Sequence, residues 1–246
     1  MLLDNLNLEE EQFEEAGDFI PQGGFVNDTG IYNCLIDLAY LGQSTGKAHS
    51  VTIHFRQADG KMTHRETFYI TSGEKKGTKP FYIKDGKRYA LPGYEAMNSL
   101  ALIATGKTLG QLSSEKKVVK LWNFESRSEE PTEVSLVTEM MGKPVKVGLV
   151  KCRENKRKKV GDEYLDTNEV REFNEAQKFF FANKFSTTEV KAKVTTPEFH
   201  DKWLKKYPPE FVRDRYVAVE GVPAAVDAAS ASSAAASADI NGSLFS

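Results

Sequence analysis

Hydrophobic and polar residues alternate in several short stretches of the chain, a pattern typical of β-strands with one buried face. Residues 50–57 place Val51, Ile53 and Phe55 on one face and polar side chains on the other. The turn at 58–61 contains Asp-Gly, so we expect this strand to form a hairpin with the next one. The stretches predicted as strands are 31–41, 50–57, 63–71, 116–125, 132–141 and 143–154.

The last two of these strands are separated by Gly142 alone, which predicts that they pair with each other. On the return strand of the first hairpin, Arg65, Thr67 and Tyr69 share one face. Arg56 lies on the polar face of the partner strand. We therefore expect Arg56, Arg65 and Tyr69 to be available to a ligand.

Helical signals are concentrated in three places. Residues 94–105 follow a Pro-Gly pair, carry apolar residues at helical spacing and end before a glycine, which predicts a helix. Residues 196–207 predict a second helix, and 163–185, where charged residues mix with phenylalanines, are interpreted as helical too. The basic stretch 156–162 (KRKKVGD) is expected to be a loop.

The order of three strands, a helix and further strands favours one fold class. It predicts a mostly β domain, a small OB-fold-like β-barrel with an inserted helix, followed by C-terminal helical segments. A β-rich α+β domain of another topology is the alternative.

Charge is unevenly distributed along the 246 residues. Residues 1–28 hold eight acids and no Lys or Arg, and the Ala/Ser-rich residues 223–246 hold two acids and no Lys or Arg. All 33 Lys and Arg residues therefore lie in 29–222 with 25 of the 35 acids, a net charge of +8. We predict an acidic N-terminal segment, one basic domain over 29–222 and a disordered tail. A basic body favours a polyanionic partner, and charge balance for solubility is the alternative.

Other bulk properties narrow the class of protein. Hydrophobic residues make up 40% and charged residues 28%, as in soluble globular proteins, and we expect no membrane partner because no apolar run is long enough to span a bilayer. The two cysteines, Cys34 and Cys152, form no CxxC pair, so neither a disulfide framework nor structural zinc is expected. These features favour an intracellular location.

The segment 72–94 combines cations with aromatic rings and carries the strongest functional signal. Cations neutralise phosphates and aromatic rings stack on unpaired bases, so this mixture suits single-stranded nucleic acid. The alternative is a solvated basic hairpin whose rings pack inward. The candidate residues are Lys75, Lys76, Lys79, Lys84, Lys87 and Arg88, with Phe81, Tyr82, Tyr89 and Tyr94.

A second basic stretch begins on the predicted strand 143–154. Lys151 and Arg153 lie on one face of that strand and lead toward the run at 156–159. We include both as candidate phosphate contacts, with a solvated loop as the alternative for the run.

Catalytic motifs are missing from the sequence. It contains no phosphate-binding GxxxxGK[ST], no GxGxxG after a strand, no GxSxG and no HExxH. His49, His54 and His64 surround the first hairpin, but no Asp, Glu or Cys at ligand spacing completes a metal site. We therefore predict no enzyme activity, no metal and no cofactor. A metal-dependent nuclease is one alternative, since its acidic ligands can be far apart in sequence, and a protein-interaction module with a basic face is another.

Residues 20–190 resemble a family of single-stranded DNA-binding proteins of tailed bacteriophages. The most specific part is YITSG, followed by the Lys- and aromatic-rich stretch and LPGY. Further similarity lies in GIYNCLIDLAYLG, VTIHFRQADGK, VKLWNFE and KPVKVGLVKCRENKRKK. The resemblance implies an OB-fold that coats single-stranded DNA without strong sequence preference during phage replication, recombination or repair, in the host cytoplasm. Preference for DNA over RNA stays open.

The resemblance also implies a role for the C-terminus. Such proteins often end in an acidic tail with a terminal aromatic residue that recruits phage or host replication proteins. Here Phe245 supplies the aromatic residue, whereas the acidic run lies at the other end of the chain, at Glu9–Glu15.

Overall fold

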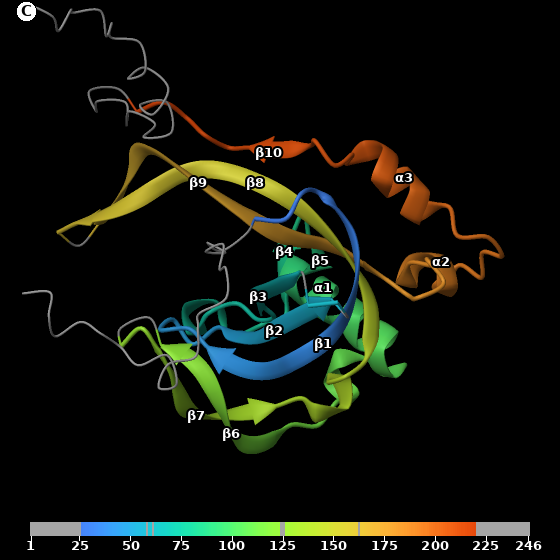
Figure 1. Cartoon of the computed structure of the whole chain (residues 1–246). Helices are drawn as coiled ribbons and strands as arrows, with labels where there is room; N and C mark the ends of the chain where they lie inside the picture. The colour runs from blue at the N-terminus through green and yellow to red at the C-terminus, as the bar shows by residue number, and fades with distance from the viewer. Residues whose placement is uncertain (1–25, 58, 61, 124–125, 162, 220–246) are drawn as a thin grey trace, which may run out of the picture.

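The computed structural model describes residues 26–57, 59–60, 62–123, 126–161 and 163–219 and shows a mostly β protein with a few helices (Figure 1). The strands are β1 Gly30–Gln43, β2 His49–Gln57, β3 Thr63–Tyr69, β4 Phe81–Lys84, β5 Lys87–Ala90, β6 Glu115–Asn123, β7 Ser128–Leu136, β8 Pro144–Val160, β9 Glu163–Phe180 and β10 Val212–Asp214. The helices are α1 Pro92–Thr105, α2 Thr187–Lys191 and α3 Phe199–Lys206, with short 3₁₀ turns at η2 Glu74–Lys76, η3 Leu109–Gln111 and η4 Thr138–Met140.

Eight of the strands form one sheet. Five of them follow one another in the order β10-β8-β1-β2-β3, and β6, β7 and β9 branch from this path. β9 pairs with β8, and β6 joins through β7, which touches the end of β1 at Tyr40 and Leu41. Among the described residues β3 and β9 share no strand pairing. Instead the backbone N–H of Ala176 donates to the Glu66 carboxylate at 2.6 Å. The mostly β class is confirmed, and barrel closure and the OB-fold assignment stay predictions.

The core follows the alternation in the sequence. Val51, Ile53 and Phe55 are fully buried, as predicted for one face of β2. The predicted helix is present as α1, which buries Met97 and Leu100 against the same cluster. The helix predicted at 196–207 is present as α3, and its Trp203 packs in a second cluster with Cys152 and Phe180.

The helical prediction for 163–185 is wrong, because this segment forms β9. β8 and β9 pair in antiparallel register from Lys146 opposite Phe180 to Val160 opposite Glu163. Phe179 and Phe180 pack in the two different core clusters, as the two-residue period of a strand predicts for neighbouring side chains. Long-range pairing with β8 therefore overrides the local mixture of charged and aromatic residues.

Two other details of the prediction are wrong. The basic run at 156–160 is part of β8, and the turn comes at Gly161, whose φ is +63°. The strands at 132–141 and 143–154 do not pair with each other, because β7 pairs with β6 and β8 pairs with β1 and β9. The Gly142 N–H instead donates to the Ile36 carbonyl at 2.7 Å, which returns the chain to β1.

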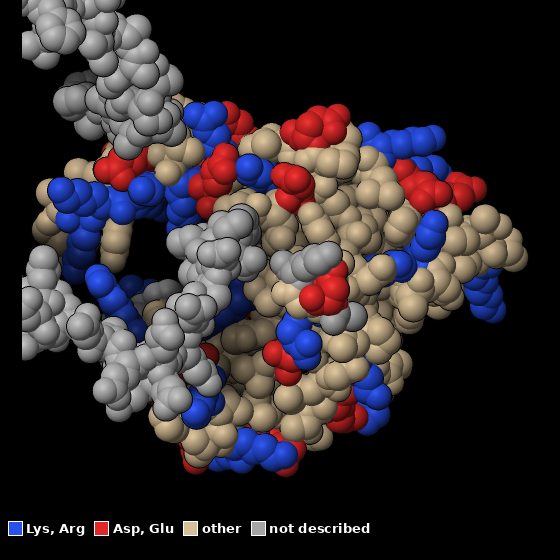
Figure 2. Space-filling view, in the orientation of Figure 1, with Lys and Arg blue, Asp and Glu red and all other residues tan. Residues whose placement is uncertain are grey.

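The end of the β8–β9 hairpin projects as a twisted arm on the left of Figure 1. Lys and Arg side chains gather on it in Figure 2. Lys156 and Arg157 of this arm pair with Glu169 and Asp166 at 3.0 and 2.9 Å. Among the residues that the structure describes, no helix is both long and apolar enough to cross a membrane. Most of the segments 1–28 and 223–246, including Glu9–Glu15 and Phe245, lie outside the described residues.

Candidate nucleic-acid interface

The segment 72–94 folds into a turn and a small hairpin that stands apart from the main sheet. β4 and β5 pair only with each other, and the turn between them has positive φ at Asp85 (+50°) and Gly86 (+72°). Two consecutive residues with positive φ are the requirement of a type I′ hairpin turn, which Asp-Gly satisfies. The sequence therefore specifies this hairpin locally.

Backbone hydrogen bonds fix the turn that precedes the hairpin, and a close backbone contact fixes the end that follows it. The Ser72 N–H donates to the Lys79 carbonyl at 2.8 Å, and the Glu74 N–H donates to the Gly46 carbonyl at 2.9 Å, in the β1–β2 turn. Where the hairpin leads into α1, Gly93 lies against β3. A Cβ atom at this position would be 2.2 Å from the carbonyl oxygen of Tyr69, so the close approach requires glycine.

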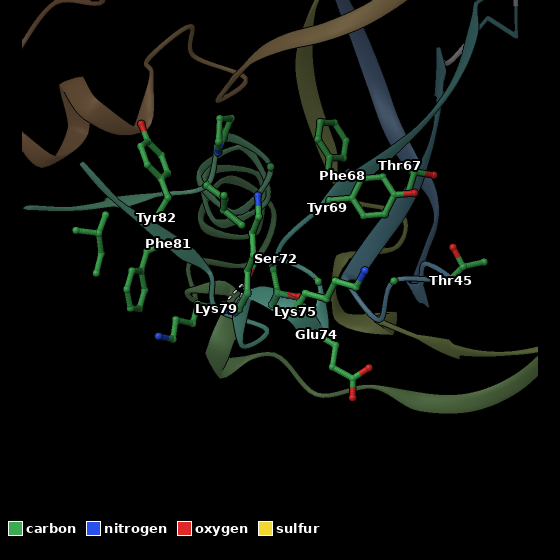
Figure 3. A pocket seen from close by; sticks show the side chains of 18 residues that line it. Thr45, Thr67, Phe68, Tyr69, Ser72, Glu74, Lys75, Lys79, Phe81 and Tyr82 are labelled. Carbon is green, nitrogen blue, oxygen red and sulfur yellow. Dashed lines mark hydrogen bonds between the residues drawn. The ribbon is translucent and has the colours of Figure 1, made fainter. Parts of the chain in front are cut away.

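A groove of about 1130 Å³ lies between this hairpin and the end of β3. In Figure 3 Tyr69 stands on one side, Phe81 and Tyr82 stand on the other, and Lys75 and Lys79 come from the segment between them. The side chains of Tyr69 and Tyr82 are 52% and 45% exposed, which leaves ring surface free for a ligand.

The groove brings together six of the predicted site residues. These are Tyr69, Lys75, Lys76, Lys79, Phe81 and Tyr82. None of the three lysines forms an ion pair with any residue in the described part of the chain, and Glu74 is the one acid of the lining. The groove wall therefore combines uncompensated positive charge with exposed aromatic surface.

The remaining predicted site residues of the hairpin lie beyond the groove lining. Lys84 and Lys87 are opposite each other beside the turn, and both are exposed. Tyr89 stacks on Tyr82, with ring centroids 5.6 Å apart and an interplanar angle of 25°. The guanidinium of Arg88 lies 4.9 Å from the centroid of the Phe81 ring. Tyr89 and Arg88 therefore pack against the two rings of the wall.

Arg56 and Arg65 lie in a separate hollow of about 200 Å³ on the outer face of β2 and β3. The guanidinium of Arg56 donates to Asp37 Oδ1 at 3.0 and 3.1 Å, which compensates its charge. Arg65 donates to the Tyr40 hydroxyl at 3.1 Å and forms no ion pair with any residue that the structure describes. Arg65, Thr67 and Tyr69 do share one exposed face, as predicted.

His54 lies in the same hollow and adds no positive charge near neutral pH. Burial lowers the pKa of His54 below its ordinary value, and the neighbouring Arg65 lowers it further, against an opposing effect of Asp37. His64 lies nearby and contacts Glu66 at 2.8 Å. The described residues contain no group of three or more His, Cys, Asp or Glu side chains placed to hold a metal ion.

The last three predicted residues are not part of the groove. Tyr94 lies on the first turn of α1 and lines a different hollow. Lys151 pairs with Glu172 at 3.1 Å, and Arg153 lies 3.8 Å from Asp214 and over the ring of Tyr216. The two basic residues of β8 therefore engage the neighbouring chain segments.

The sequence reasoning missed one wall of the groove, formed by Thr45, Gly46 and Thr71. The signal was available in the predicted strand order. Because β2 is antiparallel to both neighbours, the β1–β2 turn and the end of β3 must lie at the same end of the sheet.

The buried thiols take no part in this surface. Burial raises the pKa of Cys34 to about 12, and burial with Glu175 nearby raises the pKa of Cys152 to about 11.

Comparison of the chain with protein-family models gives no match, and comparison with curated proteins gives none either.

Proposed function

We propose that this protein binds single-stranded DNA through the groove between the β4–β5 hairpin and the end of β3, and that it does so without catalysis. The observation that carries the proposal is the juxtaposition of Lys75, Lys76 and Lys79, which have no ion-pair partners in the described chain, with the exposed rings of Tyr69 and Tyr82. Lysines track the phosphates of a strand, and each stacked base contributes roughly 1–3 kcal/mol. Such contacts are independent of base identity.

Two further features support a single strand over a duplex. The base-stacking partners are side chains inside a groove, and only unpaired bases offer their faces to such rings. The outer face of β3, which carries both Arg65 and Tyr69, leads to the groove in the way that an OB-fold presents its sheet to oligonucleotides. We therefore propose an OB-fold-like arrangement, and coating of DNA in phage replication, recombination or repair within the host cell as the setting.

Binding of fluorescein-labelled oligo-dT and of a duplex of the same length, followed by anisotropy at two salt concentrations, tests the proposal. We expect preferential binding of the single strand and weaker binding at higher salt. Equal affinity for both forms would contradict it and favour a general polyanion binder. An oligo-rU competitor reports the preference for DNA over RNA.

Incubation of the labelled strand with Mg²⁺ or Mn²⁺ tests the absence of catalysis. We expect an intact strand on a denaturing gel. Cleavage that a chelator abolishes would favour the metal-dependent nuclease.

A further inference from the structure

The groove does not end at the hairpin, because Pro92 lines both the groove and a second hollow of about 540 Å³. This second hollow lies between the first turns of α1, the start of α2 and the end of β9. Ser99 and Thr187 join the two helices through a 2.6 Å hydrogen bond between their hydroxyls. The hollow is therefore a built surface of the fold and not a gap between mobile parts.

The second hollow has the same chemistry as the groove. Lys178 and Lys191 supply positive charge, and neither forms an ion pair with a described residue. Tyr94 supplies an aromatic ring, and Asn98 supplies a polar side chain. Glu95 is the only acid in the lining, so positive charge prevails.

A third hollow, of about 340 Å³, continues the series onto α3. It shares Lys178 with the second hollow and adds Lys206 and the 39% exposed ring of Phe199. The ammonium group of Lys178 lies 5.3 Å from the centroid of the Phe199 ring. Lys202 also lines this hollow, but Glu198 compensates its charge at 2.6 Å.

The three hollows follow one another because Pro92 lines both the groove and the second hollow, and Gln177 and Lys178 line both the second and the third. Figure 1 shows α2 and α3 next to each other at the right of the molecule. We propose that a single strand leaving the groove continues along this helical surface, with phosphates on Lys178, Lys191 and Lys206 and a base on Phe199. This surface is a second part of the binding site, and the inference rests on the proposed function of the groove. We call it the helical track.

Single-stranded DNA is the occupant that the observations favour. Lys178, Lys191 and Lys206 lie on three different elements, β9, α2 and α3, and are not clustered. Such spacing suits the phosphates that repeat along a DNA strand, and the ring of Phe199 lies beside Lys178. A folded acidic protein would need a broad complementary surface, whereas these are small hollows of about 540 and 340 Å³ that share lining residues with one another and with the groove.

The test compares strand lengths. Oligo-dT of about 4 and about 16 nucleotides, the limits of site size for one OB-fold, separates the groove from the track. The variant is Lys191→Ala with Lys206→Ala. The matched control is Lys143→Ala with Lys205→Ala, which removes the same charge from exposed positions outside the three hollows.

For the long strand, we expect the track variant to reduce the slope of log K against log salt by about 1.4, since two fewer phosphates are neutralised at about 0.7 each. For the short strand we expect no difference from the control. Binding of the long strand equal to that of the control would overturn the helical track, and so would an equal loss for both lengths, which indicates a general field effect.

Lys79→Ala keeps the two proposals separable. If it weakens binding of both lengths while the track variant behaves like the control, the groove stands and the track fails. If Lys79→Ala weakens neither, the proposed function itself fails. A poly-Glu peptide serves as a competing ligand. If the substitutions at Lys191 and Lys206 weaken binding of this peptide but not binding of oligo-dT, DNA is not the occupant of the track.

Discussion

Tyr82→Ala removes the most accessible ring on the hairpin side of the groove. Tyr82 is 45% exposed, lines the groove, and has one face covered by Tyr89 at a centroid distance of 5.6 Å. One covered face leaves one face for one base. The variant would therefore lose a single stacking contact, and the groove lining loses one ring.

The magnitude follows from this geometry. One stacked base contributes roughly 1–3 kcal/mol, and each 1.4 kcal/mol changes an equilibrium constant about tenfold. We expect Kd for oligo-dT to rise about 5- to 150-fold in Tyr82→Ala. The slope of log K against log salt should stay unchanged, because no phosphate contact is lost.

Anisotropy titrations of three variants at two salt concentrations separate stacking from damage to the hairpin. Tyr82→Phe keeps the ring and should bind like the wild type. Tyr89→Ala breaks the same Tyr–Tyr pair but leaves the groove lining complete, so its effect should be smaller than that of Tyr82→Ala. Equal losses in Tyr82→Ala and Tyr89→Ala would refute the reasoning, and so would wild-type binding by Tyr82→Ala.

Three further outcomes are expected. Lys79→Ala should lower the salt slope of oligo-dT binding by about 0.7 to 1, because one phosphate is no longer neutralised, and an unchanged slope would exclude Lys79 from the interface. Gly93→Ala should destabilise the fold by about 1–3 kcal/mol in urea unfolding, since its Cβ would meet the Tyr69 backbone at 2.2 Å. Gly110→Ala, with open space around it, is the control and should be nearly neutral. Glu189→Ala should lower the free energy of unfolding by about 1 kcal/mol near neutral pH, because a capping box is lost. Burial alone would raise the Glu189 pKa, but backbone N–H donors at Ser186, Phe199 and Glu198 outweigh it and lower the pKa from 4.5 to about 2. The contribution of the carboxylate is therefore present above about pH 4.5 and disappears as the pH falls toward 2. A constant difference between wild type and variant across that range would contradict this assignment.

Local patterns predicted most of the fold where the interactions that decide it are local. The β2–β3 hairpin follows from alternation and an Asp-Gly turn, and α1 follows from Pro at its start and Gly106 at its end, where φ is +74°. The β4–β5 hairpin lies in the segment identified from its composition. In each case the deciding residues are within a few positions of one another.

The failures all involve strand pairing that the local pattern did not reveal, between consecutive strands for β8 and β9 and between distant strands for β1 and β8. β9 and the extended end of β8 are strands because they pair with each other. β7 does not pair with β8, its expected partner, because β8 pairs with β1 instead. Composition located the lysines and rings of the groove, but it did not separate Tyr82, which lines it, from Tyr89, which supports it. That distinction depends on the fold of the hairpin.

The β4–β5 hairpin has a consequence for the thermodynamics of binding. It contains no fully buried side chain and shares no strand pairing with the main sheet, and isolated two-stranded hairpins are marginally stable in water. One wall of the groove is therefore its least stable part, and a bound strand would order that wall as it enters. Part of the interaction energy is then consumed in ordering, which gives binding a favourable enthalpy offset by an unfavourable entropy. A groove with one adaptable wall would accommodate purines and pyrimidines alike, so the proposed lack of sequence preference would follow from local instability as well as from the chemistry of the contacts.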